Sequence, residues 1–480
     1  MNMAGFREYG EYDAVGLAAL VKAGEVTVSQ VLDEAVARMK RMQPKLNAVT
    51  CEMGAIAREA IANQLPDGPF RGVPFMLKDL HAFYKNVPTQ YGSKFFTNFI
   101  PDHDTEIVAR YKAAGLNIFA KTNTPELGMC ISTEPQSHGA VPNPWRLTHS
   151  AGGSSGGSAA VVAAGVIPMA HATDGAGSIR IPASCCGLVG LKPSRGRNPI
   201  GPDVLDSINL VHHVVSRTVR DSALALDATS GSELGSPNPP FKNAKSFADE
   251  LDCDPGNLKI ALSKRVAYGS MLDPACVNGV DAVAREMEKL GHVVEEAEPD
   301  IDLSFIAEFW RMNNAVSTFD MLSHRESITG KKLQPGDVEP ITFAAFEAGA
   351  DIRAFDLFKG IKEAQRMGQR LAKFYQSYDL LLTPTLAIRP FELGYITMKE
   401  RDTDAYWDRF FRCIPFTAQQ NLTGQPAISL PLAMSDDGLP IGIQLAGPFG
   451  EEAKILRVAG QLEQAMPWKN RRPSSDGDED

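Results

Sequence analysis

Residues 152–193 read GGSSGGSAAVVAAGVIPMAHATDGAGSIRIPASCCGLVGLKP. Two clusters rich in glycine and serine, at 152–158 and 175–178, flank an apolar segment. Glycine lets the backbone approach a ligand closely and adopt positive φ, so the clusters predict two tight turns that present hydroxyl and amide N–H groups. A flexible linker is the alternative interpretation. The segment AAVVAAGVIPMA (159–170) argues against a linker, because it is apolar enough to be buried.

The overall composition is that of a globular protein. The chain has 480 residues, of which 44% are apolar and 22% charged, which suits a large core and excludes disordered and fibrous classes. Its net charge of −10 argues against nucleic acid or an anionic membrane as the main partner, because both require a basic surface. Charges interrupt the N-terminal segment MNMAGFREYGEYD, and no run of 18 apolar residues occurs. We expect a cytoplasmic protein, and the sequence leaves a homodimer open.

The cysteines agree with a reducing compartment. Seven are present, an odd number, and none forms a C-x-x-C pair. This pattern is typical of reduced thiols without structural zinc. The positions are Cys51, Cys130, Cys185, Cys186, Cys253, Cys276 and Cys413.

Alternating helical and strand patterns predict an α/β fold. A capping box at 27–30 begins an amphipathic N-terminal helix, and GVPFMLKDL (72–80) is typical of a buried strand. A helix from Asp104, its N-cap, to Ala114 and a strand over 116–121 follow, and 158–165 predicts a helix that is buried on all sides. Further strands are predicted at 259–262, 293–296, 380–382, 427–431 and 441–445, with helices over much of 300–375 and at 451–464. We expect a single domain over 1–470 with an N-terminal helical segment, and a disordered acidic tail over 471–480.

A serine hydroxyl needs a base to become a nucleophile, and histidine is the usual base. None of the nine histidines lies in an evident orienting motif, and His171 is interpreted as the end of a strand. The G-x-S-x-G match at 152–156 is a weak signal for a nucleophile elbow. An elbow requires an apolar strand directly before it, whereas NPWRLTHSA (143–151) precedes this match.

Lys78 is a better candidate for the base. It follows the apolar residues GVPFML, so a strand would carry its amine into the interior, where desolvation lowers a lysine pKa and favours the neutral form. The alternative is a lysine at a strand end that reaches solvent or pairs with Asp79.

Three segments resemble the signature of the amidase signature family: GGSSGGS (152–158), ATDGAGSIRIPA (172–183) and CCGLVGLKPSRGR (185–197). Five more segments resemble family landmarks in the same order, namely GVPFMLKDL (72–80), AKTNTPELG (120–128), DLLLTPT (379–385), NLTGQPAISLPL (421–432) and GLPIGIQLAGP (438–448). The resemblance therefore covers nearly the whole chain. It implies a large, open, mostly mixed β-sheet covered by helices on both faces, and amide hydrolysis through a serine acyl-enzyme without metal or organic cofactor.

The resemblance also implies a catalytic triad of Ser178 as nucleophile, Ser154 as bridging serine and Lys78 as base. The two serines are 24 residues apart, as in the family pattern. The family holds the bridging serine through a cis peptide, which would be the Gly153–Ser154 bond here. Ser155 is the alternative bridge, and we interpret it as a supporting hydrogen-bonding residue.

The same resemblance places an oxyanion hole in the backbone N–H groups of Gly175, Ala176, Gly177 and Ser178. The commonest family pattern has two glycines before the nucleophile, whereas this chain has Ala176 and then Gly177. We expect positive φ at Ala176, where an alanine would be strained and would narrow or tilt the hole.

Five further residues are predicted around the site. Asp174 and Arg180 bracket the nucleophile turn and are expected to hold it in a structural role. Gly128, Met129 and Cys130 resemble the family segment that faces the scissile group. Cys130 is interpreted as a wall of the substrate pocket because no partner base for a thiol nucleophile is evident.

Within the family, the chain most resembles the branch of 6-aminohexanoate cyclic-dimer hydrolases and aryl acylamidases. The expected partner is a small or medium, mostly apolar amide, such as a cyclic or linear oligoamide, an anilide or a carbamate. Specificity is expected from residues 310–319 and from the segment after Thr385. The alternatives are an inactive scaffold, against which the filled triad argues, and the glutamine-hydrolysing A subunit of an aminoacyl-tRNA amidotransferase, against which the apolar Ile181 argues.

Overall fold

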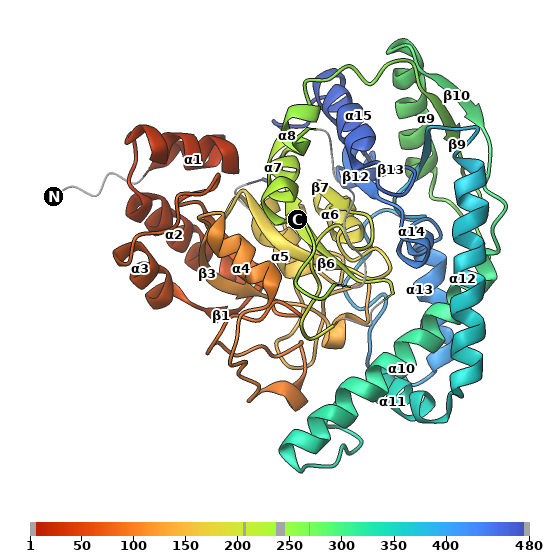
Figure 1. Ribbon diagram of the computed structural model, residues 1–480, viewed down its shortest axis with the longest axis horizontal. Helices are drawn as coiled ribbons and strands as arrows, with labels where there is room; N and C mark the ends of the chain where they lie inside the picture. The colour runs from red at the N-terminus through yellow and green to blue at the C-terminus, as the bar shows by residue number, and fades with distance from the viewer. Residues whose placement is uncertain (1–5, 205–207, 237–244, 268, 475–480) are drawn as a thin grey trace.

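A mixed β-sheet of eight strands forms the centre of the computed structural model, which describes residues 6–204, 208–236, 245–267 and 269–474 (Figure 1). The strand order is β10-β9-β11-β13-β12-β7-β8-β6. The strands β10, β9 and β11 run parallel, and every other neighbouring pair is antiparallel. The bounds are β6 Met169–Asp174, β7 Val189–Lys192, β8 Val211–Ser216, β9 Lys259–Leu262, β10 Val293–Glu296, β11 Leu380–Pro384, β12 Ala427–Met434 and β13 Pro440–Ala446.

A smaller sheet continues from one edge of the large sheet. It has the order β1-β3-β2, with β1 at Val49–Glu52, β2 at Pro74–Lys78 and β3 at Asn117–Thr122. The strands β2 and β6 lie side by side, and the backbone N–H of Lys78 donates to His171 Nδ1 over 3.2 Å. We call this boundary between β2 and β6 the seam. A separate hairpin joins β4 (Pro142–Asn143) to β5 (Arg146–Ser150).

Helices cover both faces of the large sheet. Alternate apolar residues of the strands pack against α7, α9 and α15 on one face, as the strand period of two requires. On the other face, β11 packs near the end of α12, and α6 lies against β12 and β13. The helices are α1 Ala14–Ala23, α2 Val28–Leu46, α3 Gly54–Ala62, α4 Glu106–Ala113, α5 Gly156–Ala163, α6 Arg180–Cys186, α7 Val219–Thr229, α8 Phe247–Glu250, α9 Pro274–Lys289, α10 Leu303–Thr329, α11 Pro340–Asp351, α12 Ala354–Phe374, α13 Thr403–Cys413, α14 Ala418–Thr423 and α15 Glu452–Ala465, with short 3₁₀ helices at η1 Arg7–Glu11, η2 Lys94–Phe96 and η3 Glu126–Gly128.

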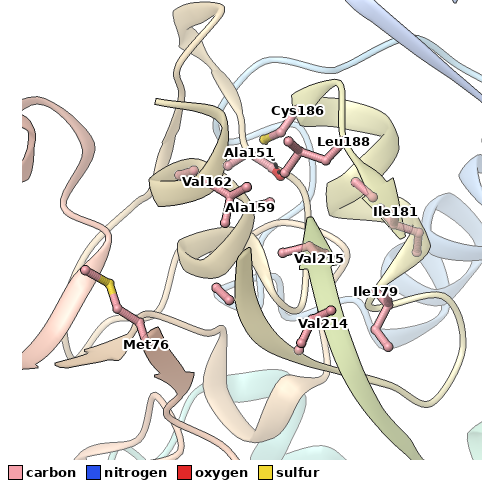
Figure 2. Close-up of a cluster of buried hydrophobic side chains, with 14 of the residues drawn as sticks. Met76, Ala151, Ala159, Val162, Ile179, Ile181, Cys186, Leu188, Val214 and Val215 are labelled. Carbon is pink, nitrogen blue, oxygen red and sulfur yellow. Dashed lines mark hydrogen bonds between the residues drawn. The ribbon is translucent and has the colours of Figure 1, made fainter. Parts of the chain in front are cut away.

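The helix α5 is the buried helix that the sequence predicts. Its residues from Gly156 to Val162 are all buried, because small and apolar side chains allow close approach on every side. Figure 2 shows Ala159 and Val162 of α5 near Val214 and Val215 of β8. The turn that contains Ser154 is therefore anchored to the interior of the protein.

Most predicted elements are confirmed, with boundaries that differ by a few residues. The N-cap of α4 is Thr105 rather than Asp104, whose carboxylate instead accepts hydrogen bonds from the Lys85 N–H and Lys112 Nζ. His171 lies inside β6 rather than at a strand end. A strand, β5, does precede the first glycine cluster, but it belongs to the hairpin and is largely solvent-facing.

The fold class is confirmed as a mixed α/β sheet with helices on both faces. Within the described residues, no helix combines the length and apolar character needed to cross a membrane. Residues 475–480 of the predicted acidic tail lie outside the described residues. The single domain over 1–470 stays a prediction.

Candidate active site

Lys78 is fully buried at the end of β2, where all five strand residues are buried. Its Nζ lies 2.6 Å from Ser154 Oγ and 2.8 Å from Thr173 Oγ1. Burial lowers the pKa of Lys78 well below its usual value, and the negative charge of Asp174 offsets this only in part. Lys78 therefore does not reach solvent, and Asp79 lies 3.7 Å from a different lysine, Lys121.

Ser154 lies between the cis Gly153–Ser154 peptide and the start of α5. Its close surroundings explain the neighbouring glycines. A Cβ on Gly153 would come within 2.6 Å of the Cys130 carbonyl oxygen, and a Cβ on Gly128 within 3.3 Å of Ser154 Oγ. Glycine is thus required at Gly128 and Gly153, because the backbone packs closely around the Ser154 hydroxyl and leaves no room for a Cβ.

Ser178 follows β6 and is half-buried. Ser178, Ser154 and Thr173 all line one cavity of about 640 Å³. Within the described residues, Ser178 Oγ makes no hydrogen bond, so it is free to meet a ligand in the cavity. The structure therefore brings Lys78, Ser154 and Ser178 to one place from β2, the turn before α5 and the turn after β6.

The turn after β6 is held by the carboxylate of Asp174. This carboxylate accepts hydrogen bonds from the N–H groups of Gly177 (2.6 Å) and Ile179 (3.2 Å). Within the described residues, the N–H groups of Gly175, Ala176 and Ser178 have no protein acceptor. The predicted set of four oxyanion donors is therefore corrected at Gly177, whose N–H is engaged by Asp174.

Arg180 locks this carboxylate in place. Its guanidinium forms two hydrogen bonds of 3.0 Å with Asp174, and both side chains are fully buried. The remaining N–H groups of Arg180 reach Gln444 on β13 (2.8 Å) and Asn421 on α14 (2.5 Å). Burial would raise the pKa of Asp174, but the charge and hydrogen bonds of Arg180 outweigh it and lower that pKa. The turn that contains Ser178 is thus fixed by a buried ion pair.

Comparison with known proteins agrees with this geometry. A family model described as "Amidase" matches residues 30–456. The 6-aminohexanoate-cyclic-dimer hydrolase of Paenarthrobacter ureafaciens is 36% identical over 478 residues, which cover 96% of each chain. The chain belongs to the amidase family. Its activity is therefore the hydrolysis of amide bonds.

Solved structures support the same assignment for this amidase. The structure of a 6-aminohexanoate cyclic dimer hydrolase matches with a TM-score of 0.93 and 35% identity, covering 97% of this chain and 99% of that one. A bacterial aryl acylamidase of the amidase signature family matches with a TM-score of 0.86 and 25% identity, covering 96% and 97%. The predicted family and its branch are confirmed.

Ala176 does not strain the nucleophile turn of this amidase. The residue with positive φ in this turn is Gly177, whose φ is 134°. The backbone of Ala176 does not adopt positive φ. A Cβ on Gly177 would lie 2.6 Å from Thr417 Oγ1, which donates a 2.6 Å hydrogen bond to the Ala176 carbonyl. The expected strain at Ala176 is therefore wrong, because the conformation that needs glycine occurs one residue later.

Thr173 contacts Lys78, and the sequence did not predict this contact. Besides its hydroxyl contact with Lys78, its backbone N–H donates to Ser155 Oγ, and Ser155 Oγ donates to its carbonyl, both at 3.3 Å. The sequence offered one signal for this contact, because Thr173 directly precedes Asp174 in the motif at 172–183. Ser155 thus has the supporting position that was predicted, while its role stays a prediction.

Gly128, Met129 and Cys130 line the cavity, as expected from the resemblance. Tyr406 donates a 2.7 Å hydrogen bond to the Met129 carbonyl, which fixes this segment. Burial raises the pKa of the Cys130 thiol to about 12. A thiol of that pKa stays protonated, which suits a wall of the cavity rather than a nucleophile.

The cavity walls differ in part from the prediction. Residues 310–319 contribute as expected, including Trp310, whose Nε1 donates to the Gly175 carbonyl over 3.3 Å. The segment after Thr385 contributes Phe410 among the described residues, and the other large wall is built from residues 80–103. In the described part of the chain, no cluster of three histidine, cysteine or acidic side chains is arranged to hold a metal ion.

Proposed function

We propose that Ser178 is the nucleophile of this amidase, with Ser154 as proton bridge and neutral Lys78 as base. The observation that carries the proposal is the 2.6 Å contact between Lys78 Nζ and Ser154 Oγ, in a buried site that opens into the same cavity as Ser178. Burial favours the neutral amine, which has a lone pair to accept a proton.

The proton relay balances over two half-reactions. As Ser178 Oγ attacks the amide carbonyl, its proton passes to Ser154, and the proton of Ser154 passes to Lys78. The relay then returns one proton to the leaving amine, and the C–N bond breaks. Water next attacks the acyl-enzyme through the same relay, which releases the carboxylic acid and restores Ser178.

The oxyanion of each tetrahedral intermediate would be stabilised by the N–H groups of Gly175, Ala176 and Ser178. These groups lie in the turn after β6, which the Asp174 carboxylate holds through the N–H groups of Gly177 and Ile179. Donors that are already oriented need no reorganisation during the reaction, and one such donor is worth about 2.7–4 kcal/mol of barrier.

The substrate is proposed to be a small or medium, mostly apolar amide. Trp310, Phe410 and Met129 contribute apolar side chains to the cavity wall. Relatives named for a cyclic oligoamide and for aryl acylamides support an oligoamide, an anilide or a related carbamate. We further propose the cytoplasm as its compartment, because all seven cysteines are free.

Glutamine hydrolysis as an amidotransferase subunit is the less favoured function. The most similar relatives reported above act as hydrolases without such a role in their names. Ile181, which is buried and lines the cavity, offers no polar group for the carboxylate and amine of glutamine.

Mass spectrometry of the acylated enzyme tests the proposal. The protein is mixed with an anilide, a cyclic oligoamide, an ester or a carbamate, quenched, and digested. We expect the acyl group on the peptide that contains Ser178, and its loss in Ser178→Ala. An acyl group on Cys130, or turnover that survives in Ser178→Ala, would overturn the assignment. Activity that is lost on dialysis against a chelator would contradict metal-free hydrolysis.

A further inference from the structure

Arg325 lies near the end of α10 and lines the same cavity as Ser178. Trp310, fifteen residues earlier on α10, contacts the nucleophile turn through Gly175. At 1.5 Å per residue, the two α10 positions are about 22 Å apart along the helix. The cavity therefore runs beside α10 from the catalytic turn towards Arg325.

Most of the Arg325 side chain is buried, and its guanidinium has no counter-charge among the described residues. The residue is 7% exposed, and its Nε donates to the Phe95 carbonyl over 3.3 Å. The rings of Phe96 and Phe99 lie 5.4 and 5.6 Å from its central carbon. Within the described residues, no carboxylate lies within 4.0 Å of it, and its two terminal nitrogens have no acceptor.

This arrangement is unusual for a buried arginine. Arg180, which is fully buried beside the turn that contains Ser178, is by contrast neutralised by Asp174. Arg311 on α10 pairs with Asp404 at 2.7 Å and is well exposed. A mostly buried charged side chain normally has an ionic partner, whereas Arg325 lines the cavity with a guanidinium that no carboxylate among the described residues neutralises, so it can receive an anion there.

We infer that Arg325 binds a carboxylate at the far end of the substrate from the scissile amide. A guanidinium presents two parallel N–H groups that match a carboxylate, and the terminal nitrogens of Arg325 have no acceptor among the described residues. The substrate class is thus an amide that carries a carboxylate beyond an apolar spacer, such as a linear ω-amino-acid oligoamide. This inference rests on the proposed function, since it names the substrate of the same site.

Three carboxylates also line this cavity and would favour a cationic substrate end instead. Two of them are already engaged, because Asp102 and Asp203 flank His103 at 2.8 and 3.0 Å. The third, Asp320, is exposed to solvent. The buried and unpaired charge is that of Arg325, so the anionic substrate is the one that the cavity favours.

The test compares three families of anilides with acyl chains of increasing length. Their far ends carry a carboxylate, its methyl ester or an ammonium group. The enzymes are wild type, Arg325→Gln, and Arg311→Gln as a matched control on the same helix. Thermal unfolding and turnover of the neutral ester report whether each variant keeps its fold.

We expect wild type to prefer the carboxylate over the ester by about tenfold or more in kcat/KM at one chain length. Arg325→Gln should lose this preference through KM while the ester is turned over as before, and Arg311→Gln should keep it. Equal use of carboxylate and ester by wild type, or a preference for ammonium, would overturn the inference. So would a preference that survives in Arg325→Gln.

A second arm separates this inference from the proposed mechanism. Calorimetry measures the binding of a non-hydrolysable ketone analogue with a carboxylate tail, and of its ester, to wild type and Arg325→Gln. If no anilide is cleaved, the proposed function fails, while a carboxylate preference that requires Arg325 still supports the subsite. If both ligands bind wild type equally, the subsite is refuted whatever the activity. If Arg325→Gln is unfolded, Arg325→Lys replaces it, with weaker binding of the carboxylate ligand expected.

Discussion

The Nζ atom of Lys78 lies 2.6 Å from Ser154 Oγ, and both residues are buried, with exposed fractions of 0% and 2%. A protonated amine in this position would carry an unpaired charge in the interior. The same contact made by a neutral amine gives a base in direct reach of the bridging serine. The burial of Lys78 thus favours the protonation state in which its amine can accept a proton.

Removing the base should leave the fold but stop the chemistry. We expect Lys78→Met to lower kcat by about 10²–10⁴-fold, because Lys78 is the one hydrogen-bond partner of Ser154 Oγ among the residues that the structure describes. Ser178→Ala should lose at least as much, and the double variant little more, because residues that act as a unit are not additive. Anilide turnover measures all three. The exposed Lys85→Met is the matched control, and a Lys78→Met enzyme of near wild-type kcat would contradict the relay.

The pH dependence of activity follows from the lowered pKa of Lys78. The active form is neutral, so kcat/KM should rise with pH through that pKa and level off well below the ordinary lysine value of 10.5. A pH–rate profile measures the acid limb, and Lys78→Met should lack it in its residual activity. An acid limb centred near 10.5 would contradict a neutral base at physiological pH.

Stability should depend on Lys78 with a definite sign. Between its folded pKa and 10.5, the unfolded chain binds one proton more than the folded protein, so the free energy of unfolding rises with pH, by up to about 1.4 kcal/mol per pH unit. Lys78→Met removes this dependence. Its Tm relative to wild type should therefore be higher at about pH 6 than at about pH 9. Differential scanning calorimetry measures the difference, and the opposite trend would refute the burial of a neutral amine.

The ion pair between Asp174 and Arg180 should matter for both stability and rate. We expect Arg180→Met to lower the free energy of unfolding by about 3–5 kcal/mol, because it leaves a buried carboxylate unpaired. Freed from Arg180, the Asp174 side chain would also hold the N–H of Gly177 less well, so kcat should fall. Urea unfolding and turnover measure the two effects. The control is Arg353→Met in an exposed pair, which should change neither.

Two neighbouring substitutions distinguish Gly177 from Ala176. We expect Gly177→Ala to be destabilised by about 1–3 kcal/mol and to lose activity, because φ is 134° and a Cβ would meet Thr417. Ala176→Gly should keep activity close to wild type, although it restores the commoner pair of glycines. Thermal unfolding and anilide turnover compare both variants. Equal losses in the two would mean that the positive φ does not decide the conformation of this turn.

The sequence predicted the elements well, and it singled out the three residues Lys78, Ser154 and Ser178 that the fold brings together, because both depend on local patterns. The strand before Lys78, the buried helix after Ser154 and the order of the motifs each depend on short patterns. The contact of Thr173 with Lys78 was missed because it joins two strands that are 95 residues apart. No local pattern reports which side chains meet across a seam.

The hydrogen bonds within the turn after β6 also could not be predicted from the sequence. The sequence placed Gly175, Ala176, Gly177 and Ser178 together, but it did not show that Asp174 takes the N–H of Gly177. The cavity wall from residues 80–103 was also missed, because its aromatic side chains follow no periodic pattern. The unpaired charge of Arg325 could be recognised only once its neighbours were known.

The seam between β2 and β6 separates two residues of the proposed catalytic site. Lys78, the proposed base, belongs to the small sheet, while Ser178, the proposed nucleophile, follows a strand of the large sheet. A displacement of about 1 Å at a reacting group can cost about 10²-fold in rate. The rate of hydrolysis therefore depends strongly on the position of the small sheet relative to the large sheet. A small displacement between the two sheets would abolish activity even if each sheet stayed folded.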